Sequence, residues 1–161
     1  MSAEAGVSMP IEDTDPRGPA WRLFIETSAR LTTALDDDLR RVGGMSLADY
    51  HVLLLLSEAP DRRLRMKELA QRMVFSASRL TYQVDQLCSR GWLRREPAPE
   101  DRRGNYAILT DAGREAFTAA ARDHIRLVHA LFHDALSADD GRRLAQLMRC
   151  LAAHLDTKDD S

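Results

Sequence analysis

Apolar residues recur every three or four positions along much of the chain, which is the spacing of an amphipathic helix. The first such stretch runs from about Ala20 to Val42 and is closed by a pair of glycines. Its apolar stripe comprises Trp21, Phe24, Ile25, Leu31, Leu35, Leu39 and Val42. Several prolines precede it and break any helical pattern, so residues 1–18 are expected to form a flexible acidic tail.

Two shorter helices are predicted in the next segment, with a turn between them. Ser46 and Asp49 have the spacing of a capping box, which opens a helix that runs to about Ser57. The Ala-Pro-Asp sequence at 59–61 predicts the turn. The second helix spans Met66–Met73.

A further helix and a pair of strands complete the middle of the chain. Ser76 caps a helix predicted over Ala77–Ser89, and a glycine stops this helix two residues later. Residues 92–96 and 105–109 are predicted strands, and they flank a charged, turn-forming loop at 97–104.

Two long helices end the pattern. Thr110 caps one that runs to about Leu136, and a second Ser-x-x-Asp box at 137–140 opens the last one. The stripe of the last helix comprises Leu144, Leu147, Met148, Leu151 and Leu155. Strands and helices do not alternate, which excludes a doubly wound sheet. The order of elements predicts a mainly α fold with a small β-hairpin wing.

This order predicts a winged helix–turn–helix lobe at residues 46–109. A helical dimerisation region, built from the N- and C-terminal helices, is predicted at residues 19–45 and 110–156, and residues 157–161 form a tail. The terminal helices carry more apolar surface than a compact lobe of about 80 residues can cover. Symmetric self-association is the usual way to bury such surface, so a homodimer is predicted.

Composition is typical of a globular protein, since 44% of the 161 residues are hydrophobic and 30% are charged. The longest apolar run, Val52–Leu56, is far shorter than the ~18 residues of a membrane span. The N-terminus lacks the basic start and apolar stretch of a secretory signal, so a cytoplasmic protein without membrane contact is expected. Cys88 and Cys150 form no Cys-x-x-Cys motif, and each is expected to be a buried, unreactive thiol.

The net charge of −2 is unevenly distributed. Residues 1–60 hold 5 basic and 10 acidic residues, residues 61–103 hold 11 and 6, and residues 104–161 hold 7 and 9. A basic middle between acidic ends indicates that one module faces a polyanion. A solvated polar surface would give the same counts, so charge alone leaves both interpretations open.

The helix predicted from Ala77 has two chemically distinct faces. The predicted packed face comprises Ala77, Leu80, Val84, Leu87 and Cys88. The opposite face comprises Ser78, Arg79, Tyr82, Gln83 and Gln86. Hydroxyl, guanidinium and amide groups of this kind suit base edges and phosphates in a major groove. Asp85 falls at the edge of this face and is expected to point away from DNA or to orient an arginine.

Cations outside this helix fit the same partner. Lys67 lies near the start of the preceding helix, where a cation and free amide donors suit a phosphate. Arg102 and Arg103 lie at the tip of the predicted hairpin and suit a narrow minor groove. Asp101 is expected to hold an arginine in place by a salt bridge. Together these residues predict binding to double-stranded DNA.

Five motifs follow one another in a fixed order within about residues 20–155. They are Met66-Lys-Glu-Leu-Ala-Gln-Arg-Met, Ser76-Ala-Ser-Arg-Leu-Thr-Tyr-Gln-Val-Asp-Gln-Leu, Arg90-Gly-Trp-Leu-Arg-Arg, Glu100-Asp-Arg-Arg and Leu109-Thr-Asp-Ala-Gly. This series resembles the MarR family of bacterial transcriptional regulators. The resemblance implies a homodimeric, ligand-responsive repressor whose terminal helices interlock and whose two lobes bind a pseudo-palindromic operator.

Position by position, the resemblance implies contacts to both grooves of DNA. The residues that would meet the major groove are Ser76, Ser78, Arg79, Tyr82 and Gln83. Arg103 would enter the minor groove. Tyr82 stands where many members of the family carry arginine, so the operator sequence cannot be transferred from them.

The resemblance also implies a cleft between the dimer helices and the DNA-binding lobe, for a small aromatic or phenolic effector. Residues that suit such a cleft are Trp21, Ser28, Tyr50, His51 and His124. Pockets and cores share this composition, so ordinary core packing is the alternative. A bound effector would weaken DNA binding by favouring a lobe spacing unsuited to the operator.

Other functions have weaker support. His129 and His133 have a spacing that can hold zinc, with Asp134 adjacent, but a solvated pair is the simpler explanation, so neither metal nor cofactor is expected. No Gly-rich phosphate loop, nucleophile elbow or paired carboxylates suggest an enzyme. RNA is disfavoured because a helix cannot enter the narrow major groove of A-form RNA. The alternative is a winged-helix protein–protein adaptor, which would present apolar anchors where this helix presents only Tyr82.

Overall fold

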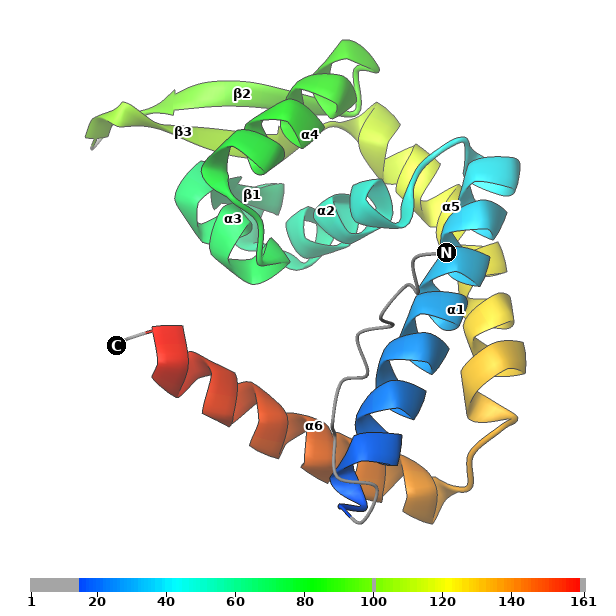
Figure 1. Ribbon diagram of the computed structural model, residues 1–161. Helices are drawn as coiled ribbons and strands as arrows, with labels where there is room; N and C mark the ends of the chain where they lie inside the picture. The colour runs from blue at the N-terminus through cyan, green and yellow to red at the C-terminus, as the bar shows by residue number, and fades with distance from the viewer. Residues whose placement is uncertain (1–14, 100, 160–161) are drawn as a thin grey trace, which may run out of the picture. The chain divides into compact units, whose positions relative to one another are not determined.

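The computed structural model describes residues 15–99 and 101–159, with the side chains of residues 101–103, 158 and 159 outside the description. The helices are α1 (Arg17–Gly43), α2 (Leu47–Glu58), α3 (Met66–Met73), α4 (Ala77–Ser89), α5 (Asp111–Val128) and α6 (Ala138–Asp159) (Figure 1). The strands are β1 (Arg63–Arg65), β2 (Leu93–Ala98) and β3 (Asp101–Leu109). A 3₁₀ turn, Pro60–Arg62, precedes β1, and a π-helical turn, His129–His133, follows α5. The predicted mainly helical fold with a β wing is confirmed.

The described part of the chain divides into two units, one that ends at Ala34 and one that begins at Leu35. Helix α1 begins at Arg17, earlier than the predicted Ala20, so its first residues overlap the predicted tail. Pro19 is tolerated there because the first N–H groups of a helix have no intrahelical partner to lose. No helix in the described part of the chain combines the length and the apolar composition needed to cross a membrane.

The predicted capping box at the start of α2 is confirmed. The Asp49 N–H donates to Ser46 Oγ at 3.0 Å, and the Ser46 N–H donates to Asp49 Oδ2 at 2.8 Å. The Leu47 N–H, also in the first turn, donates to Asp36 Oδ1 at 2.7 Å. Side chains of α2 and of the last turns of α1 therefore satisfy N–H groups that a helix start leaves free.

Among the described residues, three strands form one antiparallel sheet in the order β1–β3–β2. Leu64 pairs with Ala107, and Leu93 pairs with Leu109. Strand β1 was not predicted from the sequence, because it is too short to show an alternating pattern and runs directly into α3. The β2–β3 hairpin is also longer than predicted, because pairing continues into the predicted 97–104 loop as far as Ala98 opposite Asp101.

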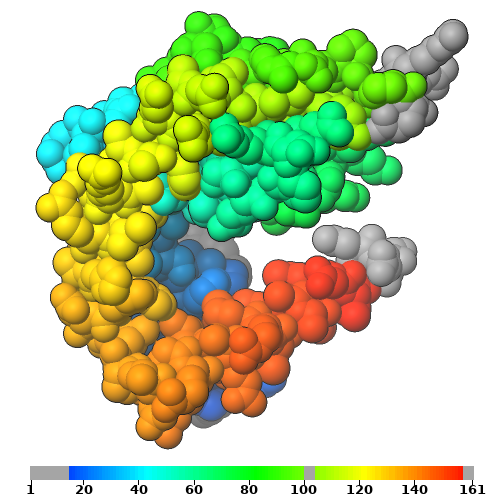
Figure 2. Space-filling model, turned by 180° about the vertical axis from the view of Figure 1, so that it is seen from behind, coloured from blue at the N-terminus to red at the C-terminus, as the bar shows by residue number. Residues whose placement is uncertain are grey.

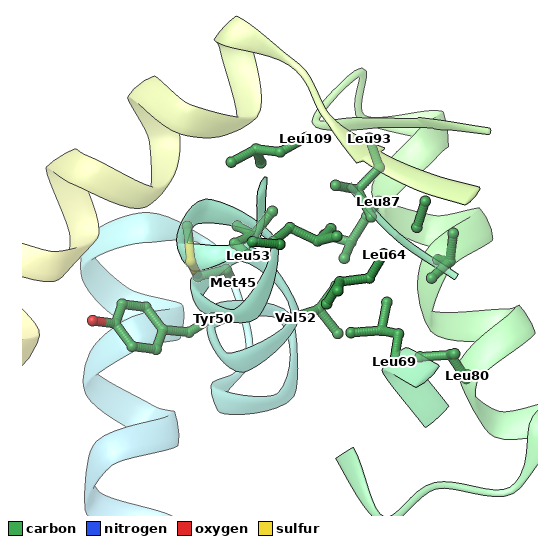
Figure 3. Packing of buried hydrophobic residues seen from close by; sticks show 14 of the residues in the cluster. Met45, Tyr50, Val52, Leu53, Leu64, Leu69, Leu80, Leu87, Leu93 and Leu109 are labelled. Carbon is green, nitrogen blue, oxygen red and sulfur yellow. The ribbon is translucent and has the colours of Figure 1, made fainter. Parts of the chain in front are cut away.

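The hydrophobic core lies where α2, α3, α4 and the sheet meet (Figure 3). Its most deeply buried side chains are Leu39, Met45, Val52, Leu53, Leu56, Leu69, Leu80, Val84 and Leu87. Burying a side chain of this size contributes roughly 1.5–3 kcal/mol, so these residues hold the helices of the lobe in place. Tyr50 lies at the edge of the cluster, with its hydroxyl directed away from the leucines (Figure 3).

The start of α5 is joined closely to the end of the wing. Thr110 Oγ1 accepts the Gly113 N–H at 3.0 Å and approaches the Trp92 carbonyl oxygen at 3.0 Å. A Cβ atom at Gly113 would lie 2.1 Å from that same carbonyl oxygen. Only a glycine allows this approach of helix to strand, because real Cβ atoms do not come so close to a backbone oxygen.

We expect Gly113→Ala to lower the free energy of unfolding by about 1–3 kcal/mol, because the added methyl group overlaps a backbone atom that cannot rotate away. Gly141→Ala in α6 is the matched control, since its Cβ would meet no described atom within 4 Å and alanine favours a helix by up to about 1 kcal/mol. Urea unfolding followed by circular dichroism measures both. Equal stability of the two variants would contradict the packing at Gly113.

Candidate nucleic-acid interface

Helix α4 is oriented by a short turn before it and by a buried stripe along it. Val74 adopts a left-handed conformation that ends α3, and Ser76 Oγ then accepts the Arg79 N–H at 3.3 Å to cap α4. Leu80, Val84 and Leu87 are buried as predicted. Ala77 was predicted on the packed face but is exposed, because it lies in the first turn, outside the core.

The opposite face of α4 presents the predicted polar side chains to solvent. The exposed members are Ser76, Ser78, Arg79, Tyr82 and Gln86. The Arg79 guanidinium lies 3.9 Å above the ring of Phe75, and the hydroxyls of Ser76 and Ser78 are 3.2 Å apart. The face therefore carries donors and acceptors that are accessible to a partner and, at Arg79, partly ordered beforehand.

Gln83 is the member of the predicted face that the structure places elsewhere. Its side chain is half-buried, and its amide Nε2 donates to Asp49 Oδ1 at the start of α2. The helical-wheel prediction put Gln83 with the exposed residues because it treated every position outside the apolar stripe as solvent-facing. The sequence contained no local signal for this contact, which joins residues 34 positions apart.

A concave, basic surface lies beside α4. A hollow of about 570 Å³ is lined by residues from β1, from the start of α3, from α4 and from the wing, and its charged residues are Arg65, Lys67, Arg95 and Glu68. Lys67 is exposed at the start of α3, as predicted. Arg95 forms an ion pair with Asp85 at 2.9 Å and donates to the Thr81 carbonyl oxygen at 3.1 Å, so Asp85 does orient an arginine.

The wing projects beyond the helices of the lobe (Figures 1 and 2). The side chains of Asp101, Arg102 and Arg103 lie outside the described residues, so their predicted roles stay predictions. The base of the wing carries cations that the sequence analysis missed. The guanidinium groups of Arg63 and Arg65 lie 4.9 and 5.0 Å from the centre of the Tyr106 ring. The charge count of the middle segment was the one available signal for them.

Two residues predicted to line an effector cleft are in contact through their rings, which are tilted by 41° to each other. The rings of Tyr50 and His124 are 4.3 Å apart, and Phe117 lies 5.1 Å from Tyr50. His124 is only 8% exposed, and its Nδ1 has no hydrogen-bond partner among the described atoms. Burial lowers the pKa of His124, and the neighbouring His51 lowers it further, while Asp38 acts in the opposite direction. The result is a buried, neutral imidazole whose Nδ1 has no hydrogen-bond partner among the described atoms.

The remaining predicted cleft residues are more accessible. His51 is exposed on α2, 6.3 Å from the Tyr50 ring. Tyr50 itself is buried, and this burial raises the pKa of its hydroxyl, as does the negative charge of Glu58. On α1, Trp21 is exposed and lies 6.4 Å from Phe24, and the carbonyl oxygen of Ser28 accepts a hydrogen bond from Thr32.

Histidines and cysteines elsewhere differ in their surroundings. The Nδ1 atoms of His129 and His133 are 3.1 Å apart on an exposed turn, and no cluster of three or more metal-ligating side chains occurs in the described part of the chain. Cys88 is half-buried, and burial raises the pKa of its thiol. Cys150 was predicted to be buried but is exposed on α6, because none of the described segments covers that face of the helix.

Comparisons with known proteins agree with this geometry. Residues 43–104 match the sequence model of the MarR family. The MarR-family regulator Sco3205 of Streptomyces coelicolor, solved in complex with DNA, is 40% identical, with 86% of each chain covered and a TM-score of 0.84. AbsC, a MarR-family regulator of the same organism, is 35% identical, with 89% of this chain and 97% of that chain covered and a TM-score of 0.85.

A third similar protein is a curated relative. The HTH-type transcriptional regulator YkoM of Bacillus subtilis (strain 168) is 31% identical over 116 residues, which are 69% of this chain and 70% of YkoM. The resemblance stated from the sequence motifs is thus confirmed. The chain belongs to the MarR family of transcriptional regulators.

Proposed function

We propose that this chain acts as a homodimer that binds a pseudo-palindromic DNA operator and represses transcription until an effector binds. The observation that carries the proposal is the exposed polar face of α4, which has no carboxylate in its first two turns and lies beside a basic hollow. Sco3205, with 40% identity, has been solved in complex with DNA, which supports the same partner for this chain.

Each part of this surface has a role in the proposal. Ser78, Arg79 and Tyr82 of α4 meet base edges in the major groove, where hydroxyls and a guanidinium can discriminate bases. Ser76 and Lys67 bind phosphates near the helix starts, and Gln86 contacts the groove farther along α4. From the wing, Arg102 and Arg103 reach the minor groove, with Asp101 holding an arginine in position.

Exposed apolar side chains on the terminal helices support the homodimer. On α6, Leu147, Leu151 and Leu155 are exposed and recur every four residues, so they form one stripe. On α1, Trp21 and Ile25 are exposed as well. Apolar stripes of this kind rarely stay in contact with water, and a second copy of the chain offers matching stripes.

The close contact between the rings of Tyr50 and His124 supports an effector site. Both side chains are buried, so a small aromatic or phenolic anion reaches these rings and forms a hydrogen bond at Nδ1 of His124 only when the packing around them opens. In the proposal His51 adds to this site, and the roles of Trp21 and Ser28 stay predictions from the sequence. The effector releases DNA because it binds the lobe spacing that the operator disfavours.

The first test selects DNA sequences from a random pool and measures their dissociation constants at fixed salt. Wild-type protein is expected to bind selectively, and Arg103→Ala to weaken binding about tenfold or more, as the loss of one good groove contact would. Arg122→Ala, an exposed arginine of α5, is the control and should bind as wild type does. Binding without sequence preference would favour a protein–protein adaptor instead.

The second test concerns the homodimer. Leu151→Glu places a charge in the apolar stripe of α6 and is expected to shift the sedimentation velocity from a dimer of the 18.1 kDa chain toward a monomer. Ala153→Glu adds the same charge on the opposite side of α6 and should leave the dimer intact. A monomeric wild type, or equal behaviour of both variants, would contradict the proposal.

The third test titrates protein–DNA complex with a panel of hydroxybenzoic acids at constant ionic strength. At least one of these acids is expected to release the DNA, and His124→Gln to need a several-fold higher concentration while binding DNA normally without ligand. His133→Gln, an exposed histidine, is the control. Release that His124→Gln leaves unchanged would exclude His124 from the effector site.

A further inference from the structure

The carboxylate of Asp49 joins two helices of the lobe through its two oxygens. Oδ2 accepts the Ser46 N–H at 2.8 Å and so caps α2, while Oδ1 accepts the side-chain amide of Gln83 in α4. Asp49 is only 9% exposed, so solvent contributes little to stabilising its charge. A buried carboxylate needs hydrogen-bond donors, and those it finds here are charge-assisted and directional.

The start of α2 is also tied to the last turns of α1, and we call the segment that joins the two helices, residues 44–46, the α1–α2 corner. Asp36 accepts the Leu47 N–H at 2.7 Å and pairs with Arg40 at 2.6 Å. The hydrogen bond from Leu47 lowers the pKa of Asp36, so the carboxyl stays ionised. Asp36 and Asp49 thus anchor the first turn of α2 in two directions, one toward α1 and the other toward α4.

A second contact joins the α1–α2 corner to the C-terminal end of α4. The Arg90 guanidinium donates to the Gly44 carbonyl oxygen at 2.7 Å and lies 3.8 Å from the centre of the Trp92 ring. Gly44 has a φ of +60°, which turns the chain between α1 and α2. Because Gln83 and Arg90 are about two helical turns apart, contacts at both residues restrain the tilt of α4 as well as its position.

These contacts conflict with a base-reading role for Gln83. To reach a base, the amide would have to leave Asp49, and a buried carboxylate oxygen would lose its donor at a substantial cost. Ser78 and Arg79 are exposed, and among the described contacts neither side chain forms a hydrogen bond to a buried carboxylate. The polar residues of α4 therefore divide into some that face outward and one that faces the α1–α2 corner.

We propose that Gln83 is a positioning residue, which sets the orientation of α4 through Asp49 and reads no base. This inference rests on the proposed DNA-binding function and adds to it the link between the α1–α2 corner and α4. Loss of the link weakens binding to all operator variants by a similar factor. Loss of a reading residue such as Ser78 instead changes which sequence is preferred.

The decisive experiment exchanges the amide of Gln83 and the carboxylate of Asp49 between the two positions. Gln83→Glu sets two carboxylates against each other and is expected to reduce operator affinity about tenfold or more. In the double variant Gln83→Glu/Asp49→Asn, the amide introduced on α2 can still accept the Ser46 N–H through its oxygen. Its NH₂ group can donate to the carboxylate introduced on α4, at unchanged net charge. We expect this exchange to restore affinity to within about threefold of wild type, with the wild-type sequence preference.

The positioning role is overturned by a double variant that stays as weak as Gln83→Glu while circular dichroism and thermal unfolding show it folded. If the double variant does not fold, Gln83→Met decides: an unchanged base preference supports the inference, and a change at a single operator position overturns it. A wild-type protein without selective DNA binding would instead refute the proposed function, and the positioning role with it.

Discussion

The buried stripe of α4 is the constraint on which the proposed DNA-binding surface depends. Leu80, Val84 and Leu87 are almost completely buried in the core shared by α2, α3 and the sheet. Since a helix is rigid, burying one face determines which side chains the other face presents. The exposure of Ser78 and Arg79 is a consequence of this packing, as is the inward direction of Gln83.

Hydrogen bonds at the start of α2 connect this surface with the proposed effector site. Tyr50, whose ring contacts that of His124, follows Asp49 directly in the sequence, and Asp49 accepts a hydrogen bond from Gln83 of α4. A ligand that shifts Tyr50 would therefore act on the residue next to Asp49, which in our proposal orients α4 through Gln83. Buried polar contacts suit such a link because they have few alternative geometries, whereas apolar contacts tolerate sliding.

Local patterns predicted much of this fold. The boundaries of α3 and α4 and the capping residues Ser46 and Thr110 followed from short-range spacing. For Asp85, the ion pair with an arginine was one of two predicted alternatives, and the structure shows it. The errors share a cause, which is that packing partners are not visible in local spacing. Strand β1 is only three residues long and is defined by its pairing with β3, and Cys150 was taken for a core residue from its apolar neighbours alone.

By itself, the sequence determined the helical periods, the caps, the turn positions and the motif series of the MarR family, because each of these depends on residues close together in the chain. Only the tertiary structure decided the partners of buried polar groups. Gln83 meets Asp49 across 34 positions, and His124 of α5 meets Tyr50 of α2. No periodicity encodes such pairs, since they form only where packing brings distant segments together and excludes the water that would otherwise satisfy them.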